Sequence, residues 1–418
     1  EELLFCPLGG SGEIGMNMNL FAYGEPDNQK WIMVDIGVTF ADDTVPGIDL
    51  IYPDPGFIID KKNDLLGIIL THAHEDHLGA VPYLWQNLRC PIYATPFAAA
   101  ILRAKLREAG LLKEVPVKEI PLSASFELGP FAVEYVSVTH SIPEANSLIL
   151  RTPDGTVLHT GDWKLDPEPV VGDLTNERAF RQVGDDGVLA MVCDSTNATS
   201  EGESGSEGMV GKKLVELISG RRQGIAVTQF ASNIARMQSV VHAAQECGRE
   251  IVLVGRSLWR YAEAARATGY LDPEIRLLSD RDGAELHPSQ VLYLCTGCQG
   301  EPRAAMNKIA TQTHPRVNLS PGDCAIFSSK IIPGNEAPIG RLYGKLSALG
   351  IEVIGEETHK EIHVSGHPNR EDLKDMYSWV KPKSVIPVHG EHRHMIEHIN
   401  FAKEMQVPYP VKVENGDI

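Results

Sequence analysis

Short hydrophobic runs separated by glycine and proline predict a β-rich first part of the chain. Trp31–Val34 and Leu66–Leu70 are compact apolar runs with the length of buried strands. Phe131–Val138 alternates hydrophobic and polar positions, which is typical of a strand with one face in a core. Helices are predicted at Leu78–Leu88 and Pro96–Ala109, where a proline opens the second segment and a glycine follows it.

The pattern changes near residue 206, where longer helices begin to alternate with compact apolar runs. The predicted strands are Gly224–Thr228, Ile251–Val254 and Gln290–Leu294, and the predicted helices are Asn233–Cys247 and Ser257–Thr268. Such alternation is typical of a parallel sheet in an α/β domain. Short strands return after about residue 345. We therefore predict a domain over 206–345 that is inserted into a second domain formed by 1–205 and 346–418.

A glycine motif near the N-terminus resembles a nucleotide-binding fingerprint. Gly10–Gly15 matches G-x-G-x-x-G, and Asp35 follows the last glycine at the usual distance. That fingerprint needs a helix directly after the glycines, because the helix N-terminus holds the pyrophosphate. Met16–Tyr23 has no helical period, so we predict a strand there and interpret the glycines as a turn between strands.

The charge of the chain is unevenly distributed. The 418 residues are 43% hydrophobic and 22% charged, as in an ordinary globular protein, and carry a net charge of −18. That net charge argues at first against nucleic acid. However, residues 206–345 hold 17 Lys and Arg against 13 Asp and Glu, so the predicted insertion is the basic part. The residues proposed there for phosphate binding are Arg236, Arg256, Arg260, Arg266, Arg303 and Lys330.

The cysteines and the hydropathy bear on location. Seven scattered cysteines, an odd number, favour a reducing compartment, so a cytoplasmic protein is expected. Cys295 and Cys298 form one close pair, which lacks the second pair of a zinc ribbon and the context of a redox motif. No run approaches the about 18 apolar residues of a membrane span. Glu1 and Glu2 do not begin a signal peptide, and no membrane partner is expected.

The segment Thr71–Ala80 carries most of the candidate chemistry. It follows an apolar strand and contains His72, His74, Asp76 and His77 in the pattern H-x-H-x-D-H. Four potential ligands within six residues are hard to explain by packing. At a strand end they can converge on one ion, and imidazole with carboxylate suits zinc or manganese.

This motif resembles that of the metallo-β-lactamase superfamily, whose αββα sandwich carries one or two metal ions at a sheet edge. Matching motifs contain Asp35, His140, Asp162 and His389. The ligands implied by the resemblance are His72, His74 and His140 for one ion, Asp76, His77 and His389 for a second, and Asp162 for both. The resemblance thus implies two Zn²⁺ per chain, with Mn²⁺ or Mg²⁺ as alternative or activator. Asp35 is expected to orient the ligand histidines.

Asp162 and His389 are 227 residues apart, which exceeds the spacing in small-molecule hydrolases of this superfamily. The long insertion resembles the β-CASP nucleases, and most closely the bacterial ribonuclease J family. The motifs that carry this resemblance are Leu8–Gly15, Thr71–Gly79, His159–Asp162, Asp194–Ala198, Phe230–Asn233, His363–His367 and Pro387–Glu391. Members normally continue into a small C-terminal domain after a segment like Val413–Ile418, so that domain is expected to be missing from this chain.

The resemblance implies a hydrolase that cleaves RNA in RNA maturation and decay. It implies a 5′-to-3′ exonuclease that prefers 5′-monophosphate ends and also cuts internally. The implied catalytic residues are Asp76, Asp194 and His367, with His367 stabilising charge or protonating the leaving oxygen. The implied RNA-binding residues are Ala231, Ser232, Asn233, His363, Val364, Ser365, Gly366 and His367. Ser232-Asn233 equally predicts a helix N-cap before Ile234–Cys247.

Three alternatives remain open. A DNA-directed or RNA 3′-processing β-CASP endonuclease would share most motifs. A small-molecule hydrolase is disfavoured by the insertion, and an RNA-binding scaffold with a degenerate metal site is disfavoured by the intact ligand types. The expected partner is single-stranded RNA, entering along the boundary between the acidic and basic domains. A homo-oligomer of the full-length protein, in contact with other RNA-processing proteins, is also expected.

Overall fold

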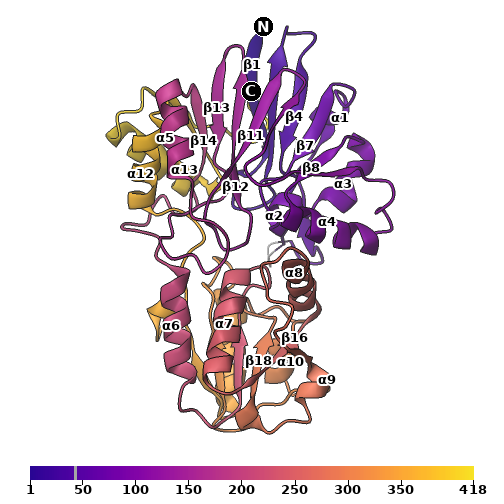
Figure 1. Cartoon of the computed structure of the whole chain (residues 1–418), viewed down its shortest axis with the longest axis vertical. Coiled ribbons are helices and arrows are strands. Elements are labelled where there is room, and N and C mark those ends of the chain that lie inside the picture. The colour runs from indigo at the N-terminus through magenta and orange to yellow at the C-terminus, as the bar shows by residue number, and fades with distance from the viewer. Residues whose placement is uncertain (42–44) are drawn as a thin grey trace. The chain divides into compact units, whose positions relative to one another are not determined.

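The computed structural model describes residues 1–41 and 45–418, which divide into two units (Figure 1). The first unit contains Glu1–Asp166, Asp173–Ser204 and Gly366–Ile418, and the second contains Pro167–Gly172 and Gly205–Ser365. The chain therefore leaves the first unit and returns to it, as in an inserted domain. The domain boundaries at 205/206 and 345/346 stay a prediction. The second unit continues past residue 345 and includes the strand β20 (Glu352–Ile354).

One sheet of the first unit has six strands in the order β1-β3-β4-β7-β8-β9. The strands are β1 (Glu2–Gly9), β3 (Met18–Gly24), β4 (Lys30–Val34), β7 (Leu65–Ile69), β8 (Ile92–Ala94) and β9 (Val117–Glu119). The first three pair antiparallel and the last four pair parallel. The strands predicted at Trp31–Val34 and Leu66–Leu70 are confirmed as β4 and β7.

The other sheet of this unit has seven strands in the order β10-β11-β12-β13-β14-β21-β23. The strands are β10 (Ser125–Leu128), β11 (Phe131–Ser137), β12 (Asn146–Thr152), β13 (Gly155–His159), β14 (Ala190–Asp194), β21 (Ser384–Val388) and β23 (Tyr409–Pro410). β14 and β21 pair in parallel with Asp194 opposite Val388, although the segment Gly205–Ser365 of the second unit lies between them in sequence. That register brings the ends of both strands to one edge of the sheet.

Apolar side chains of the two sheets form a shared core. Phe21, Ile32 and Ile69 of the first sheet belong to one buried cluster with Phe131 and Leu148 of the second. A second cluster joins the outer face of the second sheet to α5 (Glu177–Asp186), α12 (Arg370–Val380) and α13 (His392–Glu404). Figure 1 shows these three helices on the β14 side of the unit, and α3 and α4 on the β8 side. The predicted αββα sandwich is therefore confirmed.

The helices near the first sheet differ in one place from the prediction. They are α1 (Gly56–Ile59), α2 (Glu75–Leu78), α3 (Val81–Leu88) and α4 (Pro96–Glu108). A single helix over Leu78–Leu88 was therefore wrong, because two short helices meet at Gly79 and Ala80. The Ala80 N–H donates to the Ile36 carbonyl instead of continuing a helix, and Pro82 has no N–H to donate.

The second unit contains a six-stranded sheet in the order β17-β16-β18-β15-β19-β20, in which every pair is parallel. The further strands are β15 (Ile225–Thr228), β16 (Glu250–Val254), β17 (Leu277–Ser279), β18 (Val291–Cys295) and β19 (Cys324–Phe327). The helices are α6 (Glu207–Ile218), α7 (Ile234–Glu246), α8 (Arg256–Ala267), α9 (Asp280–Gly283), α10 (Ala305–Ala310) and α11 (Glu336–Ala348). The predicted α/β insertion is confirmed.

The glycine motif near the N-terminus forms a turn, as predicted. Gly10 and Gly12 have φ values of 89° and 86°, in the left-handed region that favours glycine. β3 follows the motif where a nucleotide-binding fold would have a helix. The short strand β2 (Ser11–Gly12) pairs with β22 (Gly390–Glu391), and the Gly10 carbonyl accepts a 2.6 Å hydrogen bond from the His389 N–H. The glycine turn therefore holds the backbone of His389 in place.

The remaining predictions concern cysteines and membranes. Cys295 and Cys298 are buried free thiols, and burial raises the pKa of Cys298 to about 12, which disfavours the reactive thiolate. Across residues 1–41 and 45–418, every helix is too short or too polar to cross a lipid bilayer.

A buried histidine of the first unit makes its stability depend on pH. His398 on α13 is fully buried, and its ring nitrogens contact Ser195 Oγ at 2.8 Å and Tyr377 Oη at 2.9 Å. Burial lowers the pKa of His398 from 6.5 to about 4. Between these values the unfolded chain binds a proton here that the folded chain does not bind. Stability contributed by the neutral ring is therefore lost as pH falls from 6.5 to about 4.

We expect His398→Gln to have a smaller loss of unfolding free energy between pH 7 and pH 5 than the unsubstituted protein, by about 2 kcal/mol. Urea titrations at both pH values measure this difference. His242→Gln, which changes an exposed histidine on α7, is the control and should keep the original pH dependence. Equal pH dependence in both variants would contradict the assignment.

Candidate metal centre

The predicted ligands lie in the first unit, at the carboxyl ends of strands from both sheets. His72 and His74 follow β7, and the next turn is α2, which carries Asp76 and His77. His140 follows β11, Asp162 follows β13, and His389 follows β21. Because parallel strands end at the same edge of a sheet, residues far apart in sequence meet there. All seven predicted ligands are brought together.

Donor atoms form three overlapping groups, and within each group they lie within 4.8 Å of one another. The groups are His72, His74, His140 and Asp162; Asp76, His77, Asp162 and His389; and Asp162, Asp194, His367 and His389. The first two have the composition of the two ligand sets expected from sequence. Asp162 belongs to all three groups. Imidazole nitrogens and carboxylate oxygens suit zinc, so the donor chemistry fits a metal ion.

In the first group, three imidazole nitrogens converge on one point. His74 Nδ1 lies 3.0 Å from His72 Nε2 and 3.0 Å from His140 Nε2. Burial lowers the pKa of His74 to about 4 and also lowers the pKa values of His72 and His140. Neutral imidazoles are the form that binds metal. Their converging lone pairs repel one another unless a cation or a shared proton lies between them.

The second group has the opposite charge pattern. His77 Nε2 lies 3.1 Å from Asp162 Oδ2, and His389 Nε2 lies 3.1 Å from Asp76 Oδ2. Burial opposes charge on all four groups. The nearby carboxylates nevertheless raise the pKa values of His77 and His389, and these histidines lower those of Asp76 and Asp162. Protons therefore hold this group together when no cation is bound.

Buried hydrogen bonds fix the orientation of the histidines. Asp35 is fully buried, contacts His77 Nδ1 at 2.7 Å and accepts two 2.8 Å hydrogen bonds from Thr71. The Gly366 carbonyl lies 2.5 Å from His140 Nδ1. With Nδ1 engaged in each case, Nε2 of His77 and of His140 faces the cluster. Partners of this kind fix the ring tautomer in metal sites.

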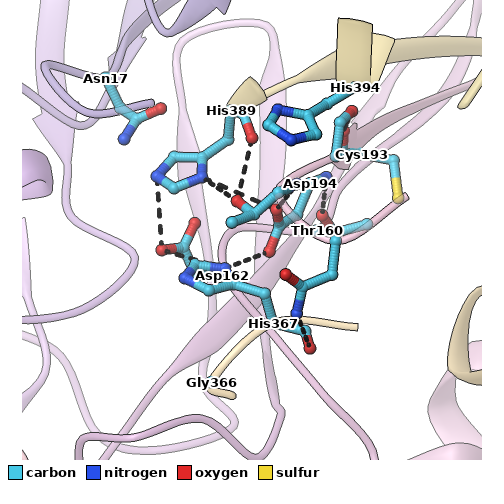
Figure 2. A network of polar contacts seen from close by, with 12 residues as sticks. Asn17, Thr160, Asp162, Cys193, Asp194, Gly366, His367, His389 and His394 are labelled. Carbon is cyan, nitrogen blue, oxygen red and sulfur yellow. Dashed lines mark hydrogen bonds and ion pairs between the residues drawn. The ribbon is translucent and has the colours of Figure 1, made fainter. Parts of the chain in front are cut away.

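Asp194 and His367 lie beside Asp162 and His389 (Figure 2). Asp194 Oδ2 is 2.7 Å from His367 Nδ1, and the carboxylate also accepts from the Thr196 N–H at 2.9 Å. Thr196 Oγ1 contacts His389 Nδ1 at 2.7 Å. Although burial opposes it, Asp194 raises the pKa of His367, so the imidazolium form is favoured. The His367 side chain is 20% exposed, whereas Asp194 is buried.

Sequence reasoning assigned no role to several residues of this site. Thr71, Thr196 and Asn17 each contact a ring nitrogen, with Asn17 Nδ2 at 3.2 Å from His77 Nε2. Thr71 and Thr196 lie within the motifs, next to predicted site residues. The hydroxyl groups of these two threonines could have indicated a role in the site. Asn17 could not be predicted in this way, because the turn after the glycine motif brings it to His77.

The predicted RNA-binding residues divide between the two units. Ala231, Ser232 and Asn233 form the turn before α7, and His363–Ser365 also belong to the second unit. Gly366 and His367 belong to the first. Asn233 is confirmed as the N-cap of α7, because its side chain accepts from the Arg236 N–H at 2.8 Å. Ser232 is half-buried, and its hydroxyl and N–H have no protein partner among the described residues.

One residue proposed for phosphate binding was wrong. Arg236 is fully buried, and its guanidinium binds the carboxylate of Glu207 through Nε at 3.0 Å and Nη2 at 2.9 Å. Its charge is therefore neutralised inside the protein and cannot reach RNA. The sequence showed a basic residue on a helix but not the face of the helix on which it lies.

Family models match most of the chain. Residues 30–179 match a beta-lactamase superfamily domain, and residues 350–412 match a Zn-dependent metallo-hydrolase RNA specificity domain. Residues 222–346 match the ribonuclease J beta-CASP domain. The sandwich, its insertion and the histidine–aspartate cluster thus define a metallo-hydrolase with an inserted β-CASP domain.

Relatives that match the whole of this chain identify its family. Ribonuclease J of Sinorhizobium meliloti is 45% identical over 418 residues, covering 100% of this chain and 74% of the relative. Ribonuclease J 1 of Streptococcus pyogenes is 38% identical, and ribonuclease J of Thermus thermophilus is 37% identical, with the same coverage. The chain belongs to the ribonuclease J family and is a metal-dependent RNA nuclease.

A solved structure supports the fold alone. The crystal structure of a protein of unknown function from Enterococcus faecalis V583 matches with a TM-score of 0.65 at 17% identity. The match covers 100% of this chain and 99% of that one.

Metal uptake should release protons, because His77 and His389 have raised pKa values in the metal-free protein and metals bind only the deprotonated nitrogen. We expect Zn²⁺ binding to the metal-free protein to release about two protons per chain near neutral pH and to weaken as pH falls. Calorimetry in buffers of different ionisation enthalpy measures this release.

Asp35→Asn should reduce the proton release, because the amide no longer stabilises the charged His77 ring. Asp173→Asn, at an exposed acid of the same unit, should behave like the unsubstituted protein. Zinc binding without proton release would contradict the charge pattern of the second group.

Proposed function

We propose that this nuclease degrades RNA from the 5′ end, prefers a 5′-monophosphate, also cuts internally, and acts in RNA maturation and decay. The observation that carries the proposal is the pair of donor groups joined at Asp162, with Asp194 and His367 beside them. Membership of the ribonuclease J family supports RNA as the substrate. The expected homo-oligomer, its contacts with other RNA-processing proteins and its cytoplasmic location remain part of the proposal.

The metal assignment follows the two donor groups. His72, His74 and His140 would hold one Zn²⁺, Asp76, His77 and His389 would hold another, and Asp162 would contact both. Mn²⁺ or Mg²⁺ would serve as alternative or activator. Two such ions supply a water of lowered pKa and stabilise the extra negative charge of the phosphoryl transition state.

His367 is proposed as the group that stabilises charge or protonates the leaving 3′ oxygen. Asp194 Oδ2 contacts its Nδ1 at 2.7 Å, and the raised pKa keeps a proton on the ring. Asp76, with a 29% exposed side chain, is more open to solvent than Asp162 at 3%. We assign Asp76 to receive the proton of the attacking water.

The 5′-monophosphate is proposed to bind in the second unit, at the turn before α7 and at His363–Ser365. Gly366 and His367 of the first unit remain proposed RNA-binding residues. The Ser232 hydroxyl and N–H lie at the start of a 13-residue helix, where a phosphate is favoured. Asn233 is proposed to act by holding this turn, because its side chain is already bonded within the protein. Backbone and hydroxyl donors can recognise a terminal phosphate without a large positive charge.

His77→Ala should lower RNA cleavage at least about a hundredfold while the fold is kept, because the second donor group loses a ligand and Asp35 loses its partner. Cleavage of single-stranded RNA, circular dichroism and metal content of the same sample measure the effect. His242→Ala is the matched control at an exposed histidine and should retain activity. Retained cleavage in His77→Ala would refute the metal assignment.

A time course on 3′-labelled RNAs with monophosphate, triphosphate or hydroxyl 5′ ends tests the direction of cleavage. We expect rapid loss from the 5′ end of the monophosphate RNA, and only internal cuts in the other two. Ser232→Ala should lower the monophosphate preference by about tenfold or more, since one hydrogen bond to a charged phosphate is lost. Ser219→Ala, at an exposed serine of the second unit, is its control. Equal rates on all ends, or faster cleavage of single-stranded DNA, would reject the proposal.

A further inference from the structure

The second unit contains a buried ion pair that no step proposed above uses. Glu207 at the start of α6 is 2% exposed and Arg236 on α7 is fully buried. The guanidinium binds the carboxylate through two nitrogens, with Nε–Oε2 3.0 Å and Nη2–Oε1 2.9 Å. This two-point geometry fixes both side chains, which a single contact would not do.

On one side, the pair holds the turn before α7. Glu207 Oε1 accepts from Asn233 Nδ2 at 3.3 Å, and Asn233 Oδ1 accepts from the Arg236 N–H at 2.8 Å. Both polar ends of the Asn233 side chain are therefore bound to the pair. Ser232, whose donors have no protein partner among the described residues, is the preceding residue.

On the other side, the pair holds the start of the His363–Ser365 segment. Arg236 Nη1 donates to the Ser328 carbonyl at 2.7 Å, to Ser328 Oγ at 2.9 Å and to the Ile362 carbonyl at 3.3 Å. Ser328 Oγ donates to the same Ile362 carbonyl at 2.6 Å. His363 follows directly, so one guanidinium connects the two segments proposed to bind the 5′-phosphate.

Stability alone does not explain such a pair. Taking two charges out of water has a large penalty, and apolar residues of similar volume often replace buried ion pairs without loss of stability. What apolar residues cannot supply is the set of directional bonds to Asn233, Ser328 and Ile362. These bonds indicate that the ion pair fixes the positions of the residues it contacts.

We propose that Glu207 and Arg236 are positioning residues for 5′-end recognition, holding the Ser232 turn and the His363 segment at the separation that a terminal phosphate requires. This inference rests on the proposed function. Neither side chain touches the substrate, because both are buried. Their loss should therefore affect RNA whose cleavage depends on its 5′ end and spare RNA that has no end.

The test uses the whole chain with metals bound and three RNAs of one sequence. These are a linear RNA with a 5′-monophosphate, a linear RNA with a 5′-hydroxyl and a circular RNA. Arg236→Lys keeps the charge but loses the forked geometry. It should lower the ratio of kcat/KM for monophosphate over hydroxyl ends about tenfold, while cleavage of the circle changes by less than about twofold. Glu207→Gln should lower the same ratio.

The matched control is Arg249→Lys. Arg249 is also a buried arginine of the second unit, and its guanidinium donates to the carbonyls of Arg221, Gln223, Pro288 and Val291, none of which belongs to the two segments. Its substitution should lower thermal stability and leave the ratio unchanged. If Arg236→Lys does not fold, the double variant Glu207→Leu/Arg236→Met replaces it, with apolar packing and the same expected loss of end preference.

The outcomes are distinct. An unchanged ratio in a folded Arg236→Lys or double variant, or an equal loss on linear and circular RNA, would overturn the positioning role. The same drop of the ratio in Arg249→Lys would also overturn it. If the unsubstituted protein shows no preference for the monophosphate end, the proposed function fails and this inference fails with it.

Discussion

The geometry of the candidate metal centre depends on the repulsion and attraction among ionisable groups at one sheet edge of the first unit. Asp162 lies in contact distance of donors from both groups, and its carboxylate is 3% exposed. Three neutral imidazoles face one another on one side of it, and two positively charged histidines face carboxylates on the other. Such an arrangement is stable only with compensating positive charge. The two sheets, the left-handed turn at Asp35 and the glycine turn behind His389 all hold these groups in place.

The two units compensate their buried charged groups in different ways. In the first unit, buried acids and histidines form a cluster whose donor atoms suit a metal ion. In the second unit, Arg236 already neutralises the buried carboxylate of Glu207. A count of basic residues therefore overstates how much positive charge the second unit offers to RNA. The remaining candidates for phosphate contact are those whose side chains reach solvent, such as Arg303 and Lys330.

The sequence predicted local features well and tertiary ones unevenly. The H-x-H-x-D-H motif is local, so its convergence could be predicted from one strand end. His140, Asp162 and His389 came from a family resemblance, because nothing in their own neighbourhoods requires a metal. The break between α2 and α3 was missed because it arises from a hydrogen bond between Ala80 and Ile36, distant in sequence. The burial of Arg236 was missed because a helical pattern does not show which neighbour covers a given face.

The order of the strands along the chain has a consequence for synthesis. β21 lies inside the second sheet, between β14 and β23, and His389 follows it, yet both belong to the last of the three segments that build the first unit. A partly translated chain therefore lacks one interior strand and one of the seven proposed ligands until the whole second unit has been made. If His389 is a ligand as proposed, the metal centre can be completed only after the second unit has been translated.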